Sequence, residues 1–160
     1  MKWRGYTICL ALSLLWCAAI LGFPWLVQSG YLKLAVVLLG LFSKICHQDP
    51  LRSFSFSGIA LPACSRCTAI YVGGLLGIAI SPSLRILPRK LKCLVDLATV
   101  ALFLDIALDL LRIWDNTVVS RSMTGGLFGL SWGLFLVAAI LRISPRFQLD
   151  PEKLIGKRPS

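Results

Sequence analysis

Long apolar runs separated by short polar stretches dominate the chain. From Gly5 to Leu32 no side chain is ionisable except for thiols and phenols, and this run exceeds the ~20 residues that a helix needs to cross a bilayer core. The pattern therefore predicts an all-α, polytopic membrane helix bundle with four to five apolar segments. These segments lie at about residues 6–27, 31–45, 65–81, 93–113 and 122–141.

The first two segments each allow a second interpretation. The first follows a short basic start, as a signal peptide would, but it is longer than the ~7–15 apolar residues of such a peptide. We therefore expect a retained membrane helix. In the second segment only the residues between Lys33 and Lys44 are uncharged. It is either a re-entrant or interfacial helix, or a short crossing whose lysines reach back to the interface.

Composition supports a membrane protein. Apolar residues make up 57% of the chain and charged residues 15%, with a mean hydropathy of +0.80, whereas a soluble domain carries about a quarter charged residues. The net charge of +10 comes from basic residues at the ends of apolar segments, where orientation signals lie. The expected partner is the lipid bilayer, together with a homo-oligomer or another membrane protein, and nucleic acid is excluded.

The distribution of basic residues predicts an orientation. If segment 31–45 re-enters, eleven Lys and Arg residues lie on the side of the N-terminus, and six lie opposite. The positive-inside rule then places the N-terminus in the cytoplasm. If all five segments cross instead, the rule favours an N-terminus outside, with ten basic residues inside and seven outside. Both arrangements place residues 46–67 together with 115–121 outside. We expect one membrane-embedded domain at 1–145 and a basic cytoplasmic tail at 146–160, in the cell membrane.

Candidate chemistry is concentrated between the second and third segments. Cys46 and the chain's single histidine, His47, precede a Cys64-Ser65-Arg66-Cys67 sequence that opens the third predicted helix. A helix N-terminus and a neighbouring arginine both stabilise thiolate. Thiolate is required for metal ligation and for disulfide exchange alike, so the spacing leaves both open.

Three interpretations of this cluster follow. Cys46, His47, Cys64 and Cys67 match the nitrogen and sulfur ligands of zinc, with Asp49 as a further candidate, although adjacent residues such as Cys46 and His47 rarely both reach one ion. A redox interpretation has Cys64 and Cys67 cycling between dithiol and disulfide. A structural interpretation has a static disulfide that fixes the loop.

Charged residues inside the fourth segment form a second candidate site. Asp105, Asp109 and Arg112 are spaced i, i+4 and i+7 and share one helix face. Charges at membrane depth are costly and usually pair or face a wet cavity. Asp109 and Arg112 are expected to neutralise one another, whereas Asp105 lies deeper and either pairs with Arg121 or is protonated and hydrogen-bonded.

Glycines recur at intervals of four in the third and fifth segments. Such small-xxx-small ridges let helix backbones approach closely, which favours helix packing over ligand binding. The residues are Gly73, Gly77, Gly125, Gly129 and Gly133.

A longer string of residues resembles a known family. Residues 46–77 read CHQDPLRSFSFSGIALPACSRCTAIYVGGLLG, which is similar to the CHQxPxRSF and LPxCxRCTxIYxG signature of domain-of-unknown-function family 2085, a family of small prokaryotic membrane proteins. A weaker similarity over 105–129 rests on Asp105, Arg121 and Thr124-Gly125, and Asn116 is displaced from the family pattern. The resemblance implies a multi-helix membrane protein in which the cysteine loop and the aspartate helix form one unit, but it implies no known reaction. The matching positions are Cys46, His47, Gln48, Pro50, Arg52, Ser53, Phe54, Leu61, Pro62, Cys64, Arg66, Cys67, Thr68, Ile70, Tyr71 and Gly73.

Three functions fit these patterns, some enzymatic and some not. The leading prediction is a membrane protein that binds a metal ion, zinc, at the extracytoplasmic mouth of the bundle. The second is a membrane thiol–disulfide oxidoreductase that exchanges electrons with a lipid-soluble carrier. The third is a small transporter or scaffold with a structural disulfide.

Overall fold

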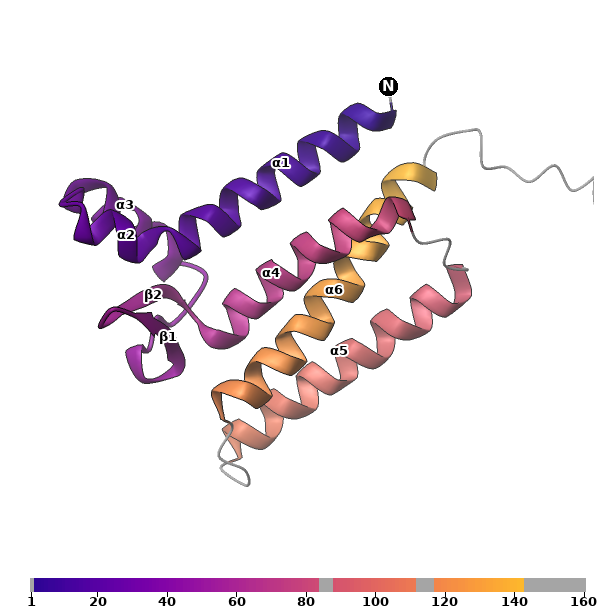
Figure 1. The fold of residues 1–160 in the computed structure, drawn as a ribbon. Helices are drawn as coiled ribbons and strands as arrows, with labels where there is room; N and C mark the ends of the chain where they lie inside the picture. The colour runs from indigo at the N-terminus through magenta and orange to yellow at the C-terminus, as the bar shows by residue number, and fades with distance from the viewer. Residues whose placement is uncertain (1, 84–87, 112–116, 143–160) are drawn as a thin grey trace, which may run out of the picture.

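The structure, a computed structural model, describes residues 2–83, 88–111 and 117–142 and is mostly helical (Figure 1). The tail predicted at 146–160 lies outside the described residues. In chain order the elements are α1 Lys2–Leu21, α2 Phe23–Gln28, α3 Leu32–Ser43, the 3-10 turn η1 Pro50–Arg52, β1 Ser53–Phe56, β2 Ile59–Cys64, α4 Ser65–Ile80, the 3-10 turn η2 Ser81–Ser83, α5 Pro88–Leu110 and α6 Val118–Arg142.

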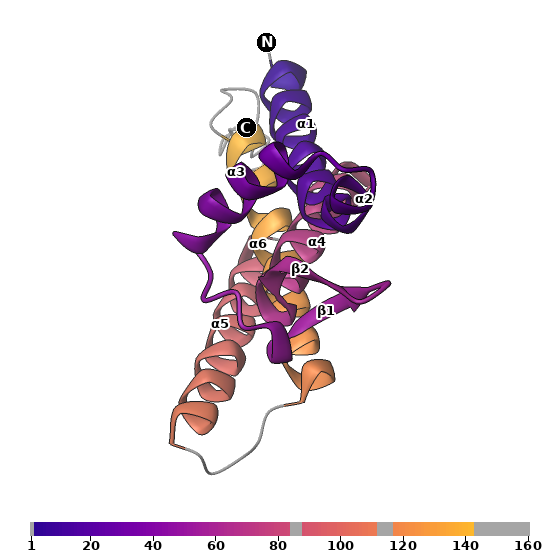
Figure 2. The same ribbon diagram turned by 90° about the vertical axis from the view of Figure 1, so that its left-hand side faces the viewer.

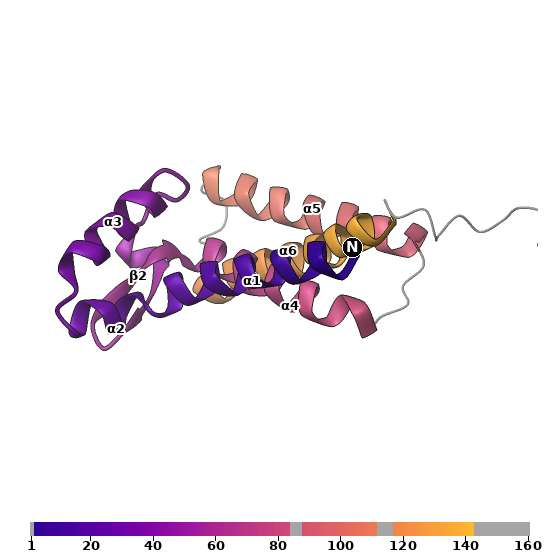
Figure 3. The ribbon, with the colours of Figure 1, turned by 90° about the horizontal axis from the view of Figure 1, so that it is seen from above.

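The four long helices lie side by side, with α6 in contact with α4, α5 and α1 (Figure 1). The start of α1, the end of α4, the start of α5 and the end of α6 share one end of the bundle. The short helices α2 and α3 and the two strands gather at the opposite end, which faces the viewer in Figure 2. Seen from above, α3 lies beyond the end of α1 (Figure 3). With its 12 residues, α3 does not run the length of the bundle (Figure 1), and the choice between a re-entrant or interfacial helix and a short crossing stays a prediction.

Two helices of the described residues are long and apolar enough to cross a bilayer, at Arg4–Leu21 and Val118–Ile140. The other helices fall short in length or carry charge: α4 has 16 residues, or about 24 Å of helix, and α5 carries three aspartates. The predicted membrane helices are thus found for two segments, and the larger number of four to five crossings stays a prediction.

The first apolar segment is two helices instead of the single one expected at 6–27. Helix α1 ends at Leu21, and α2 begins at Phe23 with Pro24 in its first turn. Proline lacks an amide hydrogen and is accommodated best at such a helix start. The chain therefore turns at Gly22, which brings α3 back towards the strands.

A two-stranded antiparallel sheet departs from the all-α prediction. The Ser-Phe alternation of β1 suits a strand, and Ser57 and Gly58, with φ of 51° and 79°, form the two-residue turn with positive φ that antiparallel hairpins favour. Phe56 pairs with Ile59 beside this turn, and an irregularity further along leaves Ser53 opposite Cys64. The hairpin matters because β2 delivers Cys64 to the start of α4.

An apolar cluster joins the short elements to the long helices. Ile20 of α1, Phe42 of α3, and Leu61 and Ala63 of β2 are buried together, and partly buried Trp16, Cys67 and Tyr71 pack against them. The Trp16 ring lies edge-on to both Phe42 and Tyr71, with centroid distances of 5.1 and 5.8 Å. This cluster fixes α3 and β2 against the first turns of α4.

Helices α4 and α6 touch through backbone atoms. A Cβ added at Gly129 would collide with the Ile70 carbonyl, and one added at Gly73 would collide with the Gly126 carbonyl. Gly77 and Gly133 are equally close to the facing helix, and Gly125 would bring a Cβ within 2.6 Å of the Arg66 carbonyl oxygen. All five glycines singled out in the sequence therefore lie where the two helices are closest.

This contact makes a prediction about stability. Gly129→Ala should lower the melting temperature of the detergent-solubilised protein, because overpacking of a close contact costs about 1–3 kcal/mol. Gly126→Ala is the matched control on the same helix, since its Cβ would lie 4.0 Å from the Ala69 carbonyl oxygen. The packing interpretation is wrong if the two variants melt at the same temperature.

Candidate metal centre

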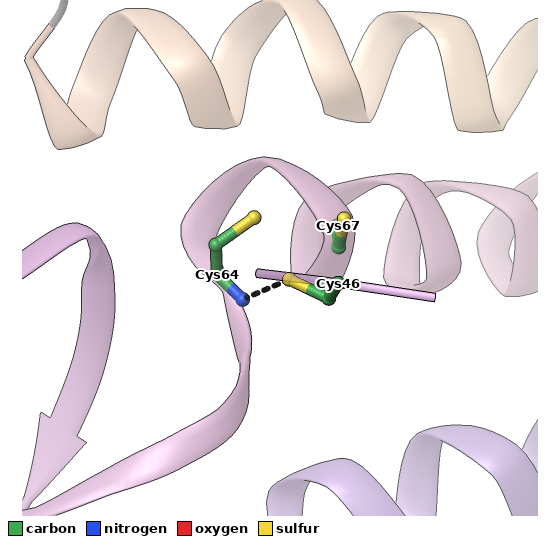
Figure 4. A group of neighbouring side chains, drawn as sticks. All are labelled: Cys46, Cys64 and Cys67. Atoms are coloured by element: carbon green, nitrogen blue, oxygen red, sulfur yellow. Dashed lines mark hydrogen bonds between the residues drawn. The ribbon is translucent and has the colours of Figure 1, made fainter. Parts of the chain in front are cut away.

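Three cysteine thiols from different elements meet at the end of the bundle that carries the hairpin. Cys46 follows α3, Cys64 is the last residue of β2, and Cys67 lies in the first turn of α4. Their sulfur atoms all lie within 4.8 Å of one another, as Figure 4 shows. Cys46 is buried, whereas Cys64 and Cys67 are partly exposed, and all three are free thiols.

The loop that carries Cys46 is held by backbone contacts. The Cys46 amide donates to the Phe42 carbonyl at 2.8 Å, which extends the end of α3 by one bond. Gln48 adopts a left-handed backbone conformation with φ of 50°. Its side-chain amide donates to the Leu39 and Pro62 carbonyls at 2.9 and 3.1 Å. Gln48 thereby ties α3 to β2 and fixes the loop between Cys46 and Cys64.

Hydrogen bonds at the cluster favour thiolate. The Cys64 amide donates to the Cys46 sulfur at 3.2 Å, the dashed contact in Figure 4. The Cys67 thiol donates to the Cys64 sulfur, and this bond lowers the pKa of Cys64 to about 5. Burial acts in the opposite direction, and the Cys67 and Arg66 amides, together with a hydrogen bond to the Cys46 side chain, add to the lowering. Cys64 is therefore a thiolate at neutral pH.

His47 does not join the three thiols. It is exposed, and its ring nitrogens are not in the group of mutually close ligand atoms, although the sequence counts His47 among four candidate ligands. Successive side chains leave the backbone in different directions, so the buried Cys46 and the exposed His47 face different surroundings. Asp49 is likewise outside this group; its carboxylate pairs with Arg52 at 3.2 Å.

A buried ion pair lies next to the cysteines. Arg66, between Cys64 and Cys67 in sequence, donates to Asp105 of α5 at 2.5 Å. Ser120 and Thr124 of α6 also lie within hydrogen-bond distance of the Asp105 carboxylate, at 3.1 and 3.2 Å. The sequence points to Arg121 as the partner of Asp105, but the structure gives Asp105 an ion pair with Arg66.

Arg121 pairs with the next acidic residue along α5. It donates to Asp109 at 2.9 Å, and Asp109 also lies 3.6 Å from Arg52, in η1. The carboxylates of Asp105 and Asp109, one helical turn apart, thus hold arginines from three different elements. The expected pairing of Asp109 with Arg112 lies outside the described residues because Arg112 is not among them, and neither is Asn116.

Sequence reasoning missed the residues that join the two candidate sites. The sequence indicates Arg66 only as a cation that stabilises the neighbouring thiolates, and it predicts no contact for Ser120 or Gln48. A usable signal was present, since Arg66 and Gln48 both belong to the motif segments that flank the cysteines. Pairing Arg66 of α4 with Asp105 of α5 needs the packing of both helices on α6, which periodicity within one helix does not provide.

The hydrogen bond from Cys67 predicts the pH dependence of alkylation. In metal-free protein, iodoacetamide labelling of Cys64 should rise between about pH 4 and pH 6 and stay level above, because a lowered pKa leaves thiolate at every higher pH. Cys67→Ala removes the donor and should move this rise to higher pH. Mass spectrometry of the peptide that contains Cys64 measures both profiles. A wild-type rise only near pH 8.5, as for an ordinary thiol, would contradict the geometry.

Two archaeal proteins resemble parts of the chain. An uncharacterized protein of Methanocaldococcus jannaschii is 32% identical over 101 residues, which cover 60% of this chain and 64% of that protein. An uncharacterized protein of Methanothermobacter thermautotrophicus is 59% identical over 32 residues, which cover 20% of this chain and 29% of its own length. The chain thus spans less than two thirds of either relative. No solved structure matches the chain.

A family match covers the cysteine cluster and both aspartates. Residues 46–135, more than half of the chain, match the family described as predicted membrane protein, DUF2085. This range begins at Cys46 and includes the Arg66–Asp105 pair and the contact between α4 and α6. The chain is a membrane protein of domain-of-unknown-function family 2085.

Proposed function

We propose that this membrane protein binds a metal ion, zinc, through the thiolates of Cys46, Cys64 and Cys67. The observation that carries the proposal is the mutual distance of the three sulfur atoms, which all lie within 4.8 Å of one another. Zinc–sulfur bonds of about 2.3 Å in a tetrahedral site place two sulfurs about 3.8 Å apart. Small side-chain rotations are therefore enough to bring all three thiolates to one ion.

Three thiolates leave one of the four preferred zinc positions for another ligand. His47 is exposed and lies outside the group of mutually close ligand atoms, so the proposed site uses three cysteines and takes its fourth ligand from water or a bound molecule. A closed fourth position would make the site structural. A water in that position would make it catalytic, since zinc lowers the pKa of bound water to about 7.

The proposed position of the site is the extracytoplasmic end of a multi-pass protein in the cell membrane. Support comes from the bundle geometry, because the start of α1 and the end of α6 share the end opposite to the cysteines (Figure 1). The positive-inside rule assigns the basic N-terminus and the 146–160 tail to the cytoplasm. The remainder, 1–145, would then form one membrane domain with the thiols on the outside.

A thiol–disulfide oxidoreductase is the second candidate, favoured by the hydrogen bond between Cys67 and the acidic thiol of Cys64. In this reaction the Cys64 thiolate and the Cys67 thiol form a disulfide and release two electrons and one proton. A lipid-soluble carrier of the quinone class would accept the two electrons, take up this proton and a second one from water, and become the quinol. The new disulfide would oxidise a substrate dithiol to a disulfide and return to the reduced form, with Cys46, whose sulfur lies near both, as the exchange partner.

The zinc proposal predicts a stoichiometric, cysteine-dependent metal. Full-length protein purified in detergent without chelator or reductant should hold about one zinc per chain, and chelation should free three thiols to a thiol reagent. Single Cys46→Ser, Cys64→Ser and Cys67→Ser variants should each lose the metal, because each removes one of three protein ligands.

His47→Ala and Cys93→Ser are the controls and should both retain zinc, because Cys93 is an exposed cysteine of α5 outside the three-thiol group. The measurements are elemental analysis and thiol titration on the same sample. Metal-free wild type with two thiols fewer than the sequence contains would refute the zinc site and favour the oxidoreductase.

A further inference from the structure

We propose that Asp105 is a positioning residue of the thiolate site and acts on it through Arg66. The inference rests on the proposed metal site, and it assigns the aspartate of α5 to that site instead of to a separate transport pathway. It connects two groups of residues that the sequence presents as independent candidates, namely the cysteines around α4 and the charged face of α5.

Arg66 is placed to act on the spacing of two thiols. It lies in the first turn of α4 between two of the proposed ligands, so its backbone is part of the loop that sets the distance between Cys64 and Cys67. Its guanidinium donates to Asp105 at 2.5 Å, and the two side chains are 17% and 6% exposed. The turn that carries two thiols therefore has a buried attachment to a different helix.

The first turn of α4 is also in contact with α6. A Cβ at Gly125 would lie 2.6 Å from the Arg66 carbonyl oxygen and 3.3 Å from its Cγ, so α6 backbone rests directly on Arg66. The turn is thus fixed at its backbone by α6 and at its side chain by α5. Removal of the Asp105 charge would release the second attachment while the first stays in place.

The Asp105 carboxylate is itself held by hydrogen bonds from two other helices. Ser120 Oγ donates to Oδ1 at 3.1 Å, while Arg66 and Thr124 approach Oδ2. Both carboxylate oxygens are therefore oriented by α4 and α6 together. Asp109 belongs to a different set of contacts, because its 2.9 Å partner is Arg121 and its other ion pair is with Arg52.

The charge of the proposed metal site also acts on Arg66. A divalent zinc ion with three thiolates carries one net negative charge, which attracts a nearby guanidinium. At this buried position an unpaired arginine is costly, so an Arg66 released from Asp105 would seek another partner. By pairing with Arg66, Asp105 keeps the guanidinium from moving to the negatively charged thiolate group. The geometry of Cys64 and Cys67 is thereby preserved. Groups that orient metal ligands in this way commonly change metal affinity by about 10–100-fold when they are lost.

The test is the zinc affinity of full-length variants in detergent, measured by competition with a chromogenic chelator. Asp105→Asn keeps the side-chain volume and removes the charge, and it should weaken zinc binding about 10–100-fold. Asp105→Glu retains a carboxylate and should restore part of that loss. Asp96→Asn is the matched control, because it removes an exposed carboxylate of the same helix and should bind zinc as the wild type does.

A double-mutant cycle separates positioning from general destabilisation. Arg66→Gln should weaken zinc about as much as Asp105→Asn, and the double variant should be no worse than either, because both changes break one interaction. The cobalt(II)-substituted Asp105→Asn variant should also show weaker thiolate-to-metal charge-transfer absorption than the wild type. If Asp105→Asn does not fold, Thr124→Val removes one contact to the carboxylate and should weaken zinc about fivefold.

The outcomes distinguish the two proposals. Wild-type protein that binds no zinc would refute the metal site. Wild-type affinity in Asp105→Asn, or in Thr124→Val where that variant replaces it, would overturn the positioning role while leaving the metal site intact. Additive losses in the double variant, with an unchanged cobalt spectrum, would overturn it as well.

Discussion

The close backbone contact between α4 and α6 is the constraint on which the rest of the structure depends. Glycines at Gly73, Gly125 and Gly129 let the two helices approach until backbone atoms face each other. At that separation the start of α6 lies against the turn that carries Cys64 and Cys67, and Ser120 and Thr124 reach Asp105. A larger residue at the contact would move α6 outward and would separate the hydroxyls from the carboxylate. Helix packing and site geometry are therefore one property of this fold.

The end of the bundle opposite the N-terminus combines short elements with costly polar groups. Phe42 and Ile20 bury the base of α3 against α1, and Gln48 joins the loop to β2 through two carbonyls. In this loop the cysteines are free thiols, and its shape is held by these contacts. Below it, the acidic residues of α5 hold arginines from η1, α4 and α6. Among the described residues, the buried charges of Asp105 and Arg121 both take part in ion pairs, as a low-dielectric environment requires.

Hydropathy predicts most of this architecture, because helix length and apolar content are local properties of the chain. The segment expected at 65–81 is α4 at Ser65–Ile80, and the one expected at 122–141 lies within α6. In the sequence the hairpin corresponds to Ser-Phe alternation followed by a Ser-Gly pair. This short pattern does not by itself predict a sheet in a chain dominated by apolar helices. The partner of Asp105 cannot be predicted from local pattern, since Arg66 is 39 residues away and lies near it because α4 and α5 both pack on α6. Likewise, adjacency in sequence grouped His47 with Cys46, although burial separates the two side chains.

The central claim is that three thiols, and no histidine, bind one metal ion. X-ray absorption spectroscopy at the zinc edge tests it most directly, because the first-shell scattering separates sulfur from nitrogen or oxygen ligands and counts them. The proposed zinc site predicts three sulfur ligands at about 2.3 Å with one lighter atom, and an unchanged spectrum in His47→Ala. A shell dominated by nitrogen and oxygen, or one with fewer than three sulfurs, would contradict the claim.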